Sequence, residues 1–214
     1  MISRHHSTIF VHIPKTAGQS VETLFLEDLG LKWRSLFPWN DRRRLLLKEN
    51  RDRSKGPERL AHLYGDEYVS LGYVTPEEFS AFYKFAIVRD PYHRAVSTYN
   101  FRSGATGTLR DFLSSIPRDE HNDLYRHIAP QSRFVVDPAT GVLLVDQIVT
   151  FEDMRTGLAT AFERTLGRPA ELPRKNISAD KKLSVADLPR ADLDYVEAEY
   201  AEDFARFGYP LRGA

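Results

Sequence analysis

Two short stretches of the chain combine residues that suit the binding of phosphate-like anions. The first runs from His12 to Ser20 and follows an apolar, β-branched run. A turn that joins a strand to a helix collects backbone N–H groups around one point, which suits a phosphate. Lys15 adds a mobile cation there. The nucleoside-triphosphate P-loop pattern is absent, because no glycine precedes Lys15. An ordinary turn capped by Thr16 is the alternative interpretation.

The second stretch, Phe85 to Tyr99, places Arg89 at the C-terminal tip of a buried strand. Ligands of open α/β sheets bind at that end of the strands. Asp90 and Pro91 favour a helix start directly afterwards. Ser97 lies about two turns into this helix, where Arg94 shares its face. An arginine fork and a hydroxyl suit a second phosphate. Arg89 as a structural ion-pair residue is the alternative.

Together these stretches resemble the cosubstrate-binding motifs of the sulfotransferases. The Lys15–Ser20 loop resembles their 5′-phosphosulfate-binding loop, and Arg89 followed by Ser97 resembles their 3′-phosphate motif. Over roughly residues 8–210 the chain is similar to the carbohydrate branch, which includes heparan 2-O- and chondroitin-type enzymes, in a compact form without a membrane anchor. Further agreement lies in Ala129–Gln131, Val145–Glu152, Leu172–Ser178 and Tyr200–Tyr209.

The resemblance implies an α/β, P-loop kinase-like three-layer fold with a central, mainly parallel β-sheet flanked by helices, in one sulfotransferase domain over residues 1–214. It implies transfer of a sulfuryl group from 3′-phosphoadenosine 5′-phosphosulfate, a cosubstrate, to an acceptor hydroxyl, commonly of a carbohydrate. It implies no required metal and no nucleic-acid partner. Lys15 would neutralise charge at the bridging oxygen, and Arg89 and Ser97 would select the 3′-phosphate. The implied 5′-phosphosulfate loop is Lys15, Thr16, Ala17, Gly18, Gln19 and Ser20.

The acceptor hydroxyl needs a general base, and histidine suits neutral pH. His62 precedes Arg89 by 27 residues, in the region where relatives place their catalytic histidine. Asp66 or Glu67 as the base, and a purely structural His62, are the alternatives. Of the other histidines, we expect His12 to face the sheet core, His5 and His6 to be an exposed and inert pair, and His93, His121 and His127 to lie at the surface.

The apolar pattern alternates strands with helices, as in an α/β domain. It predicts strands at 8–13, 69–73, 84–88, 133–136 and 142–151. It predicts helices at 18–29, 41–49, 76–82, 153–166 and about 189–207, with another opening at Asp90.

The composition excludes several classes of protein. The 214 residues include 30 basic and 30 acidic side chains and no cysteine, which excludes disulfide scaffolds and zinc–thiolate modules. No apolar run approaches the ~18 residues of a membrane span, and no secretion signal is visible, which predicts a cytoplasmic location. The neutral total hides a basic insertion at about 32–60, with ten basic against four acidic residues over 32–59, which we predict to face the acceptor.

Three features have alternatives that stay open. Arg174–Ser178, with Lys181 and Lys182, would form a basic loop over the nucleotide or a solvated loop. Trp33 and Trp39 would stack on sugar rings or anchor the core. A nucleotide-dependent kinase and a noncatalytic nucleotide- or glycan-binding module remain as rival functions.

Overall fold

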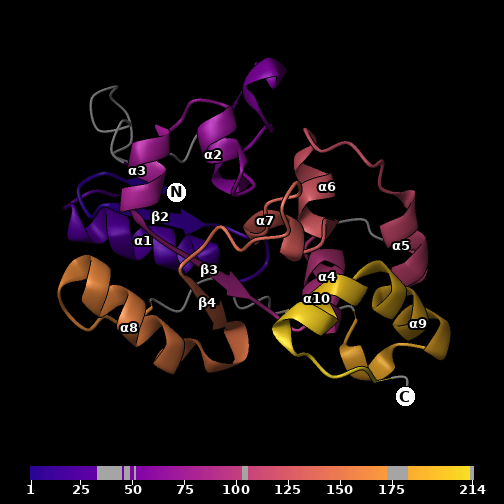
Figure 1. The fold of residues 1–214 in the computed structure, drawn as a ribbon. Helices are drawn as coiled ribbons and strands as arrows, with labels where there is room; N and C mark the ends of the chain where they lie inside the picture. Colours follow the sequence, from indigo (N-terminus) through magenta and orange to yellow (C-terminus); the bar gives the residue numbers. More distant parts are fainter. Residues whose placement is uncertain (33–44, 46–48, 51, 103–105, 173–182, 213–214) are drawn as a thin grey trace.

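A four-stranded sheet lies at the centre of the part of the chain that the computed structural model describes, residues 1–32, 45, 49–50, 52–102, 106–172 and 183–212 (Figure 1). Its strands are β1 (Ile2–Ser3), β2 (Thr8–Val11), β3 (Tyr83–Val88) and β4 (Gln147–Thr150), in that spatial order. The first pair is antiparallel and the other two pairs are parallel. The predicted α/β class with a mainly parallel sheet is confirmed.

Both faces of the sheet are covered, which explains why β2 and β3 are buried along their whole length. Phe10, Phe85 and Ile87 pack on one face against α1 (Gly18–Asp28) and α8 (Met154–Leu166). The alternate residues of the same strands pack on the other face, against Tyr64, Tyr68, Phe134 and their neighbours. The parallel strands therefore end at one edge, where the loop after β2 and Arg89 after β3 come together.

Four of the remaining helices, at the right of Figure 1, enclose a third group of buried side chains. That group joins α4, α5, α9 and α10 and includes Tyr99, Leu113 and Phe204. The bounds are α2 Glu67–Ser70, α3 Pro76–Ala81, α4 Pro91–Phe101, α5 Leu109–Ser115, α6 Asp123–Ile128, α7 Ser132–Val135, α9 Arg190–Glu199 and α10 Ala201–Phe207. Single 3₁₀ turns occupy Arg53–Lys55, Leu60–His62, Phe151–Asp153 and Val185–Asp187.

Most of the predicted elements beside the two candidate motifs are confirmed. The strands at 8–13 and 84–88 are present as β2 and β3, and the helices at 18–29, 76–82 and 153–166 as α1, α3 and α8. Asp90 caps α4 by accepting hydrogen bonds from the backbone N–H groups of Tyr92 and His93, with Pro91 in the first turn. The helix predicted at 41–49 falls almost entirely outside the described residues.

Three predicted strands are wrong or too long, and one helix is divided. Residues 69–73 complete α2 and a turn, and residues 133–136 lie largely in α7. Of residues 142–151 only Gln147–Thr150 pairs as a strand, while Val136 and Leu143 form one isolated bridge. The last helix breaks at Tyr200, whose hydroxyl donates to the carbonyl of Ile128. Helices α5 and α6 were not predicted.

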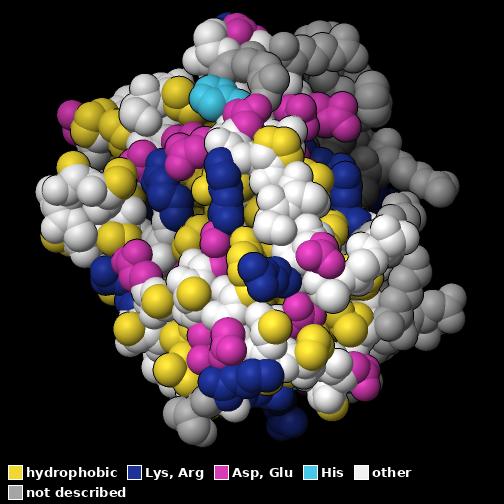
Figure 2. Space-filling view, turned by 90° about the vertical axis from the view of Figure 1, so that its right-hand side faces the viewer, with side chains coloured by type: hydrophobic (Ala, Val, Ile, Leu, Met, Phe, Trp, Pro, Cys, Tyr) yellow, Lys and Arg dark blue, Asp and Glu magenta, His cyan; other side chains and the backbone are white. Residues whose placement is uncertain are grey.

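No helix in the described ranges is long and apolar enough to cross a membrane. Figure 2 shows one face of the molecule, on which Lys and Arg side chains alternate with Asp and Glu side chains. The basic and acidic groups described on this face are therefore interspersed rather than separated.

Candidate active site

The loop between β2 and α1 has a backbone shaped for an anion. Lys15 and Ala17 both take the left-handed conformation, with φ of 70° and 69°. Such alternation turns successive N–H groups toward one side, and a left-handed non-glycine residue marks local strain. The amides of Lys15, Ala17 and Gly18 donate to no acceptor within the described residues. The Thr16 hydroxyl donates to the carbonyl of Ile13 at 2.8 Å, so it braces the turn.

Gly18 is required by a close approach to His12. A Cβ at Gly18 would lie 2.0 Å from the imidazole Cδ2 of His12. That ring is buried and its Nδ1 is 2.9 Å from Glu22 Oε1, on the first turns of α1. His12 therefore positions the loop from the core side, as the sequence predicts.

Arg89 follows β3 and is held against the same loop. Its backbone N–H donates to the side-chain carbonyl of Gln131, whose amide group donates back to the Arg89 carbonyl, both at 2.8 Å. Its guanidinium donates to the carbonyl of Lys15 at 3.2 Å and lies over the Phe151 ring at 4.2 Å. The Nε atom is buried and has no hydrogen-bond partner among the described residues. Arg89 thus has donor capacity left for a ligand.

Lys15 completes a pair of neighbouring cations. Its Nζ lies 3.9 Å from the centre of the Phe101 ring, a favourable cation–π contact at the end of α4. Burial, followed by the positive charge of Arg89, lowers the pKa of Lys15 to about 8. Neither Lys15 nor Arg89 forms an ion pair with a carboxylate in the described part of the chain. An anion between them would relieve their mutual repulsion.

Arg94 and Ser97 have different roles in α4. Arg94 is buried, and it donates to the carbonyls of Pro14, Ala129 and His127 at 2.8–3.2 Å. It ties the loop after β2 to the end of α6 and is not available to a phosphate. Ser97 is half-buried, and its hydroxyl makes no hydrogen bond within the described ranges. Ser97 lies on α4, the helix that follows Arg89, as the sequence predicts.

His62 is buried and lies in a row of imidazoles. Its Nδ1 is 2.6 Å from Asp123 Oδ1. Its ring makes edge contacts with His12 and His127, at centroid distances of 4.9 and 5.0 Å. Burial, followed by the nearby His12, Arg59 and Arg126, holds the pKa of His62 well below its usual range. A neutral imidazole can accept a proton at its free nitrogen, so His62 keeps the form that a general base needs.

The prediction that His127 lies at the surface is wrong, because α6 turns this side chain inward, where it is only 8% exposed. Its Nδ1 is 2.8 Å from the backbone carbonyl of Asp123, and its ring stacks parallel to Phe101, with centroids 5.8 Å apart. Of the other histidines, His93 and His121 are exposed as expected. His6 is not inert, because it bonds Ser3 and Asp28.

The two carboxylates considered as alternative bases are engaged elsewhere. Glu67 receives two hydrogen bonds of 2.6 Å from Arg126, which is fully buried, and another from the backbone N–H of Tyr64. Asp66 is paired with Arg133 at 2.7 Å. Both carboxylates are therefore already paired with arginine side chains.

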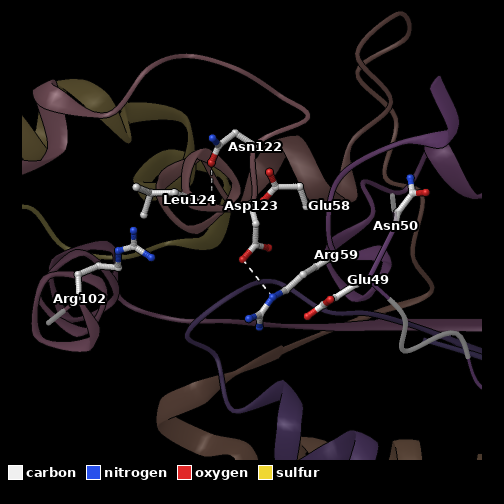
Figure 3. A pocket seen from close by; sticks show the side chains of 8 residues that line it. All are labelled: Glu49, Asn50, Glu58, Arg59, Arg102, Asn122, Asp123 and Leu124. Carbon is white, nitrogen blue, oxygen red and sulfur yellow. Dashed lines mark hydrogen bonds and ion pairs between the residues drawn. The ribbon is translucent and has the colours of Figure 1, made fainter. Parts of the chain in front are cut away.

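A polar pocket of about 540 Å³ opens beside Asp123 (Figure 3). In it Arg59 Nε lies 3.4 Å from Asp123 Oδ2, and Arg102 projects from the end of α4. The pocket thus shares Asp123 with the histidine cluster. Its described lining is Glu49, Asn50, Glu58, Arg59, Arg102, Asn122, Asp123 and Leu124.

One group of side chains in the described ranges has the donor set of a metal site. His62, Asp123 and His127 each offer one ligand atom, all within 4.8 Å of one another. The Nδ1 atoms of both histidines already bond Asp123. Hydrogen bonding accounts for this cluster without an ion.

Several predicted residues lie outside the described residues: Trp33, Trp39, most of the basic insertion at 32–60, Arg174–Ser178, Lys181 and Lys182. The structure therefore brings together the loop at 15–20, Arg89 and the row of imidazoles formed by His12, His62 and His127. The predicted basic loop lies outside the described residues.

A model of the sulfotransferase family matches residues 1–210 of the chain. The chain belongs to the sulfotransferase family. No curated protein and no solved structure matches it. The matched range includes the loop after β2, Arg89 and the imidazole row, so the family assignment covers the whole candidate site.

The functional geometry of this sulfotransferase domain depends on residues that sequence reasoning missed or treated as secondary. Gln131 positions Arg89, and Asp203 in turn holds the backbone of Gln131 and Ser132 with hydrogen bonds of 2.7 and 2.8 Å. The predictions from the sequence assign no role to Asp123. The signal that could have identified it is its spacing of four from His127, which places both on one side of a helix.

Proposed function

We propose that the chain transfers a sulfuryl group from 3′-phosphoadenosine 5′-phosphosulfate to the hydroxyl of an acceptor, with a carbohydrate as the acceptor class. The observation that carries this proposal is the contact between Lys15 and Arg89, two cations without carboxylate partners in the described residues, beside amides that donate to nothing there. A compact polyanion fits such a place. The buried Arg89 Nε, which has no hydrogen-bond partner among the described residues, supports this placement.

The proposed roles divide along the two motifs. The amides of Lys15–Gly18, with Gln19 and Ser20 at the start of α1, would bind the 5′-phosphosulfate. Arg89 and Ser97 would bind the 3′-phosphate, which ATP lacks. The cosubstrate supplies the sulfuryl group on a phosphate leaving group. Lys15 would stabilise the charge that develops on the leaving oxygen, the kind of electrostatic contribution that dominates in related group transfers.

His62 is the proposed general base. The neutral form in which burial holds His62 is compatible with this role, while Asp66 and Glu67 are paired with Arg133 and Arg126. Within this proposal the chain is one domain with the three-layer arrangement of P-loop kinases, and it needs no metal.

Lys15→Ala tests the function directly. We expect kcat to fall about 10²–10³-fold, as for loss of one oxyanion-stabilising donor, while adenosine 3′,5′-bisphosphate still raises the melting temperature. Arg206→Ala is the matched control, because Arg206 is a cation on α10 that pairs only with Glu202 in the described residues. ATP with magnesium should give a smaller shift than the bisphosphate.

Turnover is measured as transfer of labelled sulfate onto a panel of glycans and small alcohols. Wild-type turnover in Lys15→Ala would remove Lys15 from the chemistry. Unchanged turnover in His62→Ala, with bisphosphate binding intact, would remove His62 as the base. A larger melting shift with ATP and magnesium than with the bisphosphate would favour a kinase.

A further inference from the structure

Asp123 contacts both inward-facing imidazoles of the candidate site through different atoms. Its carboxylate Oδ1 lies 2.6 Å from His62 Nδ1, and its backbone carbonyl lies 2.8 Å from His127 Nδ1. Its other carboxylate oxygen lies 3.7 Å from His127 Nδ1 and 3.4 Å from Arg59 Nε. One residue at the start of α6 thus fixes the same ring atom of two histidines.

We propose that Asp123 is a positioning residue, which holds the protons of His62 and His127 on Nδ1 and presents their two Nε2 atoms as unprotonated acceptors to the reacting hydroxyl. The inference rests on the proposed function for its chemical meaning. It adds Asp123 and His127 to a site in which His62 alone was assigned.

The hydrogen-bond partners determine the tautomers. A backbone carbonyl only accepts hydrogen bonds, so the His127 nitrogen that faces the carbonyl of Asp123 carries the hydrogen. An ionised carboxylate has the same effect on His62, as the aspartate of a Ser-His-Asp triad does for its histidine. In both rings the lone pair then lies on Nε2.

Both rings stay uncharged at neutral pH. Burial, followed by the neighbouring His62, lowers the pKa of His127 to about 3, and burial also lowers the pKa of His62. The charged groups that face the pair are Asp123, Arg59, Arg126 and the N-terminal amino group around His62, with Lys15 beside His127. The cationic groups oppose protonation of the imidazoles, which Asp123 favours.

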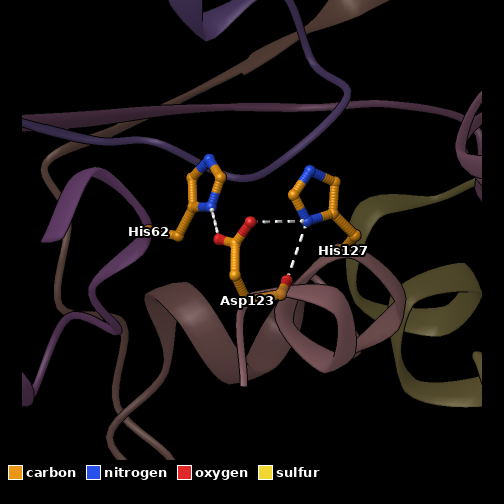
Figure 4. Close-up of side chains that lie close together, drawn as sticks. All are labelled: His62, Asp123 and His127. Atoms are coloured by element: carbon orange, nitrogen blue, oxygen red, sulfur yellow. Dashed lines mark hydrogen bonds and ion pairs between the residues drawn. The ribbon is translucent and has the colours of Figure 1, made fainter. Parts of the chain in front are cut away.

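The two free nitrogens point toward the loop that carries Lys15. Figure 4 shows both Nδ1 atoms turned to Asp123 and both other ring nitrogens on the opposite side, toward the indigo segment that follows β2. Contacts agree with this view. The His62 ring touches His12 at the base of the loop, and Phe101 lies between the His127 ring and Lys15 Nζ.

The acceptor hydroxyl gives its proton to His62 Nε2 while its oxygen forms a bond to sulfur. The bond from sulfur to the 5′-phosphate oxygen breaks, and its electron pair stays on that oxygen, next to Lys15. His127 Nε2 accepts a hydrogen bond from the bound acceptor, and Asp123 stabilises the imidazolium that forms on His62.

Asp123→Asn is the decisive variant, because an asparagine amide donates a hydrogen bond to His62 Nδ1 and moves the ring proton to Nε2. We expect kcat at pH 7 to fall at least about 10²-fold; the same exchange in a serine protease costs about 10⁴-fold. The affinity for adenosine 3′,5′-bisphosphate should change less than about threefold. Asp194→Asn, on the exposed side of α9, is the matched control.

Nitrogen-15 NMR of labelled histidine supplies a readout that a purely structural role would not change. Wild-type His62 and His127 should both show the Nδ1–H tautomer, and His62 in Asp123→Asn should show the Nε2–H tautomer. This measurement needs no turnover. It therefore tests the inference even if no acceptor is sulfated, an outcome that would count against the proposed function instead.

Three results would overturn the inference. The first is an Nε2–H tautomer for His62 in the wild-type protein, which also decides the matter if Asp123→Asn fails to fold. The second is wild-type kcat in a folded Asp123→Asn. The third is loss of turnover on treatment with a chelator and its return with zinc, which would make His62, Asp123 and His127 a metal site.

Discussion

Replacement of Gly18 by alanine tests whether the loop after β2 is held in place by His12. The new Cβ would lie 2.0 Å from Cδ2, 2.1 Å from Nε2 and 2.6 Å from Cγ of the imidazole. Carbon atoms pack at about 3.5–4.0 Å, so the ring and the loop must separate by at least about 1.5 Å. The ring is confined, because Glu22 bonds its Nδ1 and the Phe10 and His62 rings pack against it.

Two responses are open, and both are costly. If the loop moves, overpacking of this kind costs about 1–3 kcal/mol of stability. If the ring moves, it leaves the buried Glu22 carboxylate without its partner, which costs about 1.5–3 kcal/mol. Movement of the loop by more than 1 Å also displaces Lys15, and misplacement of that size costs about 10²-fold in turnover. We therefore expect a loss of both stability and kcat.

Urea denaturation and the transfer assay measure the two effects. Gly30→Ala is the control, because Gly30 has a φ of +69° but no atom within 4 Å of the new Cβ; it should cost about 1–2 kcal/mol of backbone strain and leave kcat unchanged. A double-mutant cycle with His12→Ala isolates the clash. In the His12→Ala background at least half of the Gly18→Ala penalty should disappear. A penalty that is equal in both backgrounds would refute the steric reasoning.

Three further predictions follow from buried groups. Arg94→Lys should lower the free energy of unfolding by about 3–5 kcal/mol in urea denaturation, because a lysine cannot reach the carbonyls that the buried guanidinium joins. Burial lowers the pKa values of His62 and His127 in the folded protein below the unfolded value, so the unfolded chain binds more protons and stability is lost as pH falls below about 6.5. The His127→Gln variant should therefore show a shallower dependence of the free energy of unfolding on pH, measured by denaturation at several pH values. Because the pKa of Lys15 is lowered to about 8, kcat/KM for the cosubstrate should decline above that pH, and Lys15→Arg should move the decline to higher pH.

The sequence predicts the two motif regions well because their signals are local. Residues 8–11 and 84–88 are apolar runs buried on both faces, and such runs read as strands without knowledge of their neighbours. Asp90 followed by Pro91 carries its own helix-start signal. The loop and Arg89 could therefore be placed at strand ends from sequence alone.

The error at residues 133–136 has a cause far along the chain. Phe134, Val135 and Val136 are typical of a strand, yet Ser132–Val135 is helical. Asp203, about 70 residues later, accepts hydrogen bonds from the backbone N–H groups of Gln131 and Ser132 and so bends the chain into a helical turn. A contact with this separation in sequence overrides local propensity.

The inward position of His127 could not be predicted for a similar reason. The helix that carries it is six residues long and has no clear apolar period. Its orientation depends on Arg126, which reaches Glu67, and on Arg94, which binds the carbonyls at its end. These contacts join α6 to segments before and after β3. The position of His127 therefore depends on residues that are distant in the sequence.

The arginines show why composition is a poor guide to an anion site. The 22 arginines suggest anion recognition. The buried guanidinium groups of Arg94 and Arg126, however, donate hydrogen bonds to backbone carbonyls and to Glu67. Arg89 differs because one buried donor has no partner among the described residues and its positive charge acts on the neighbouring Lys15. An anion is attracted by positive side chains that have no carboxylate partner among the described residues, next to backbone N–H groups that have no acceptor there. A chain with zero net charge can supply that place as well as a basic one, because the field that matters is local.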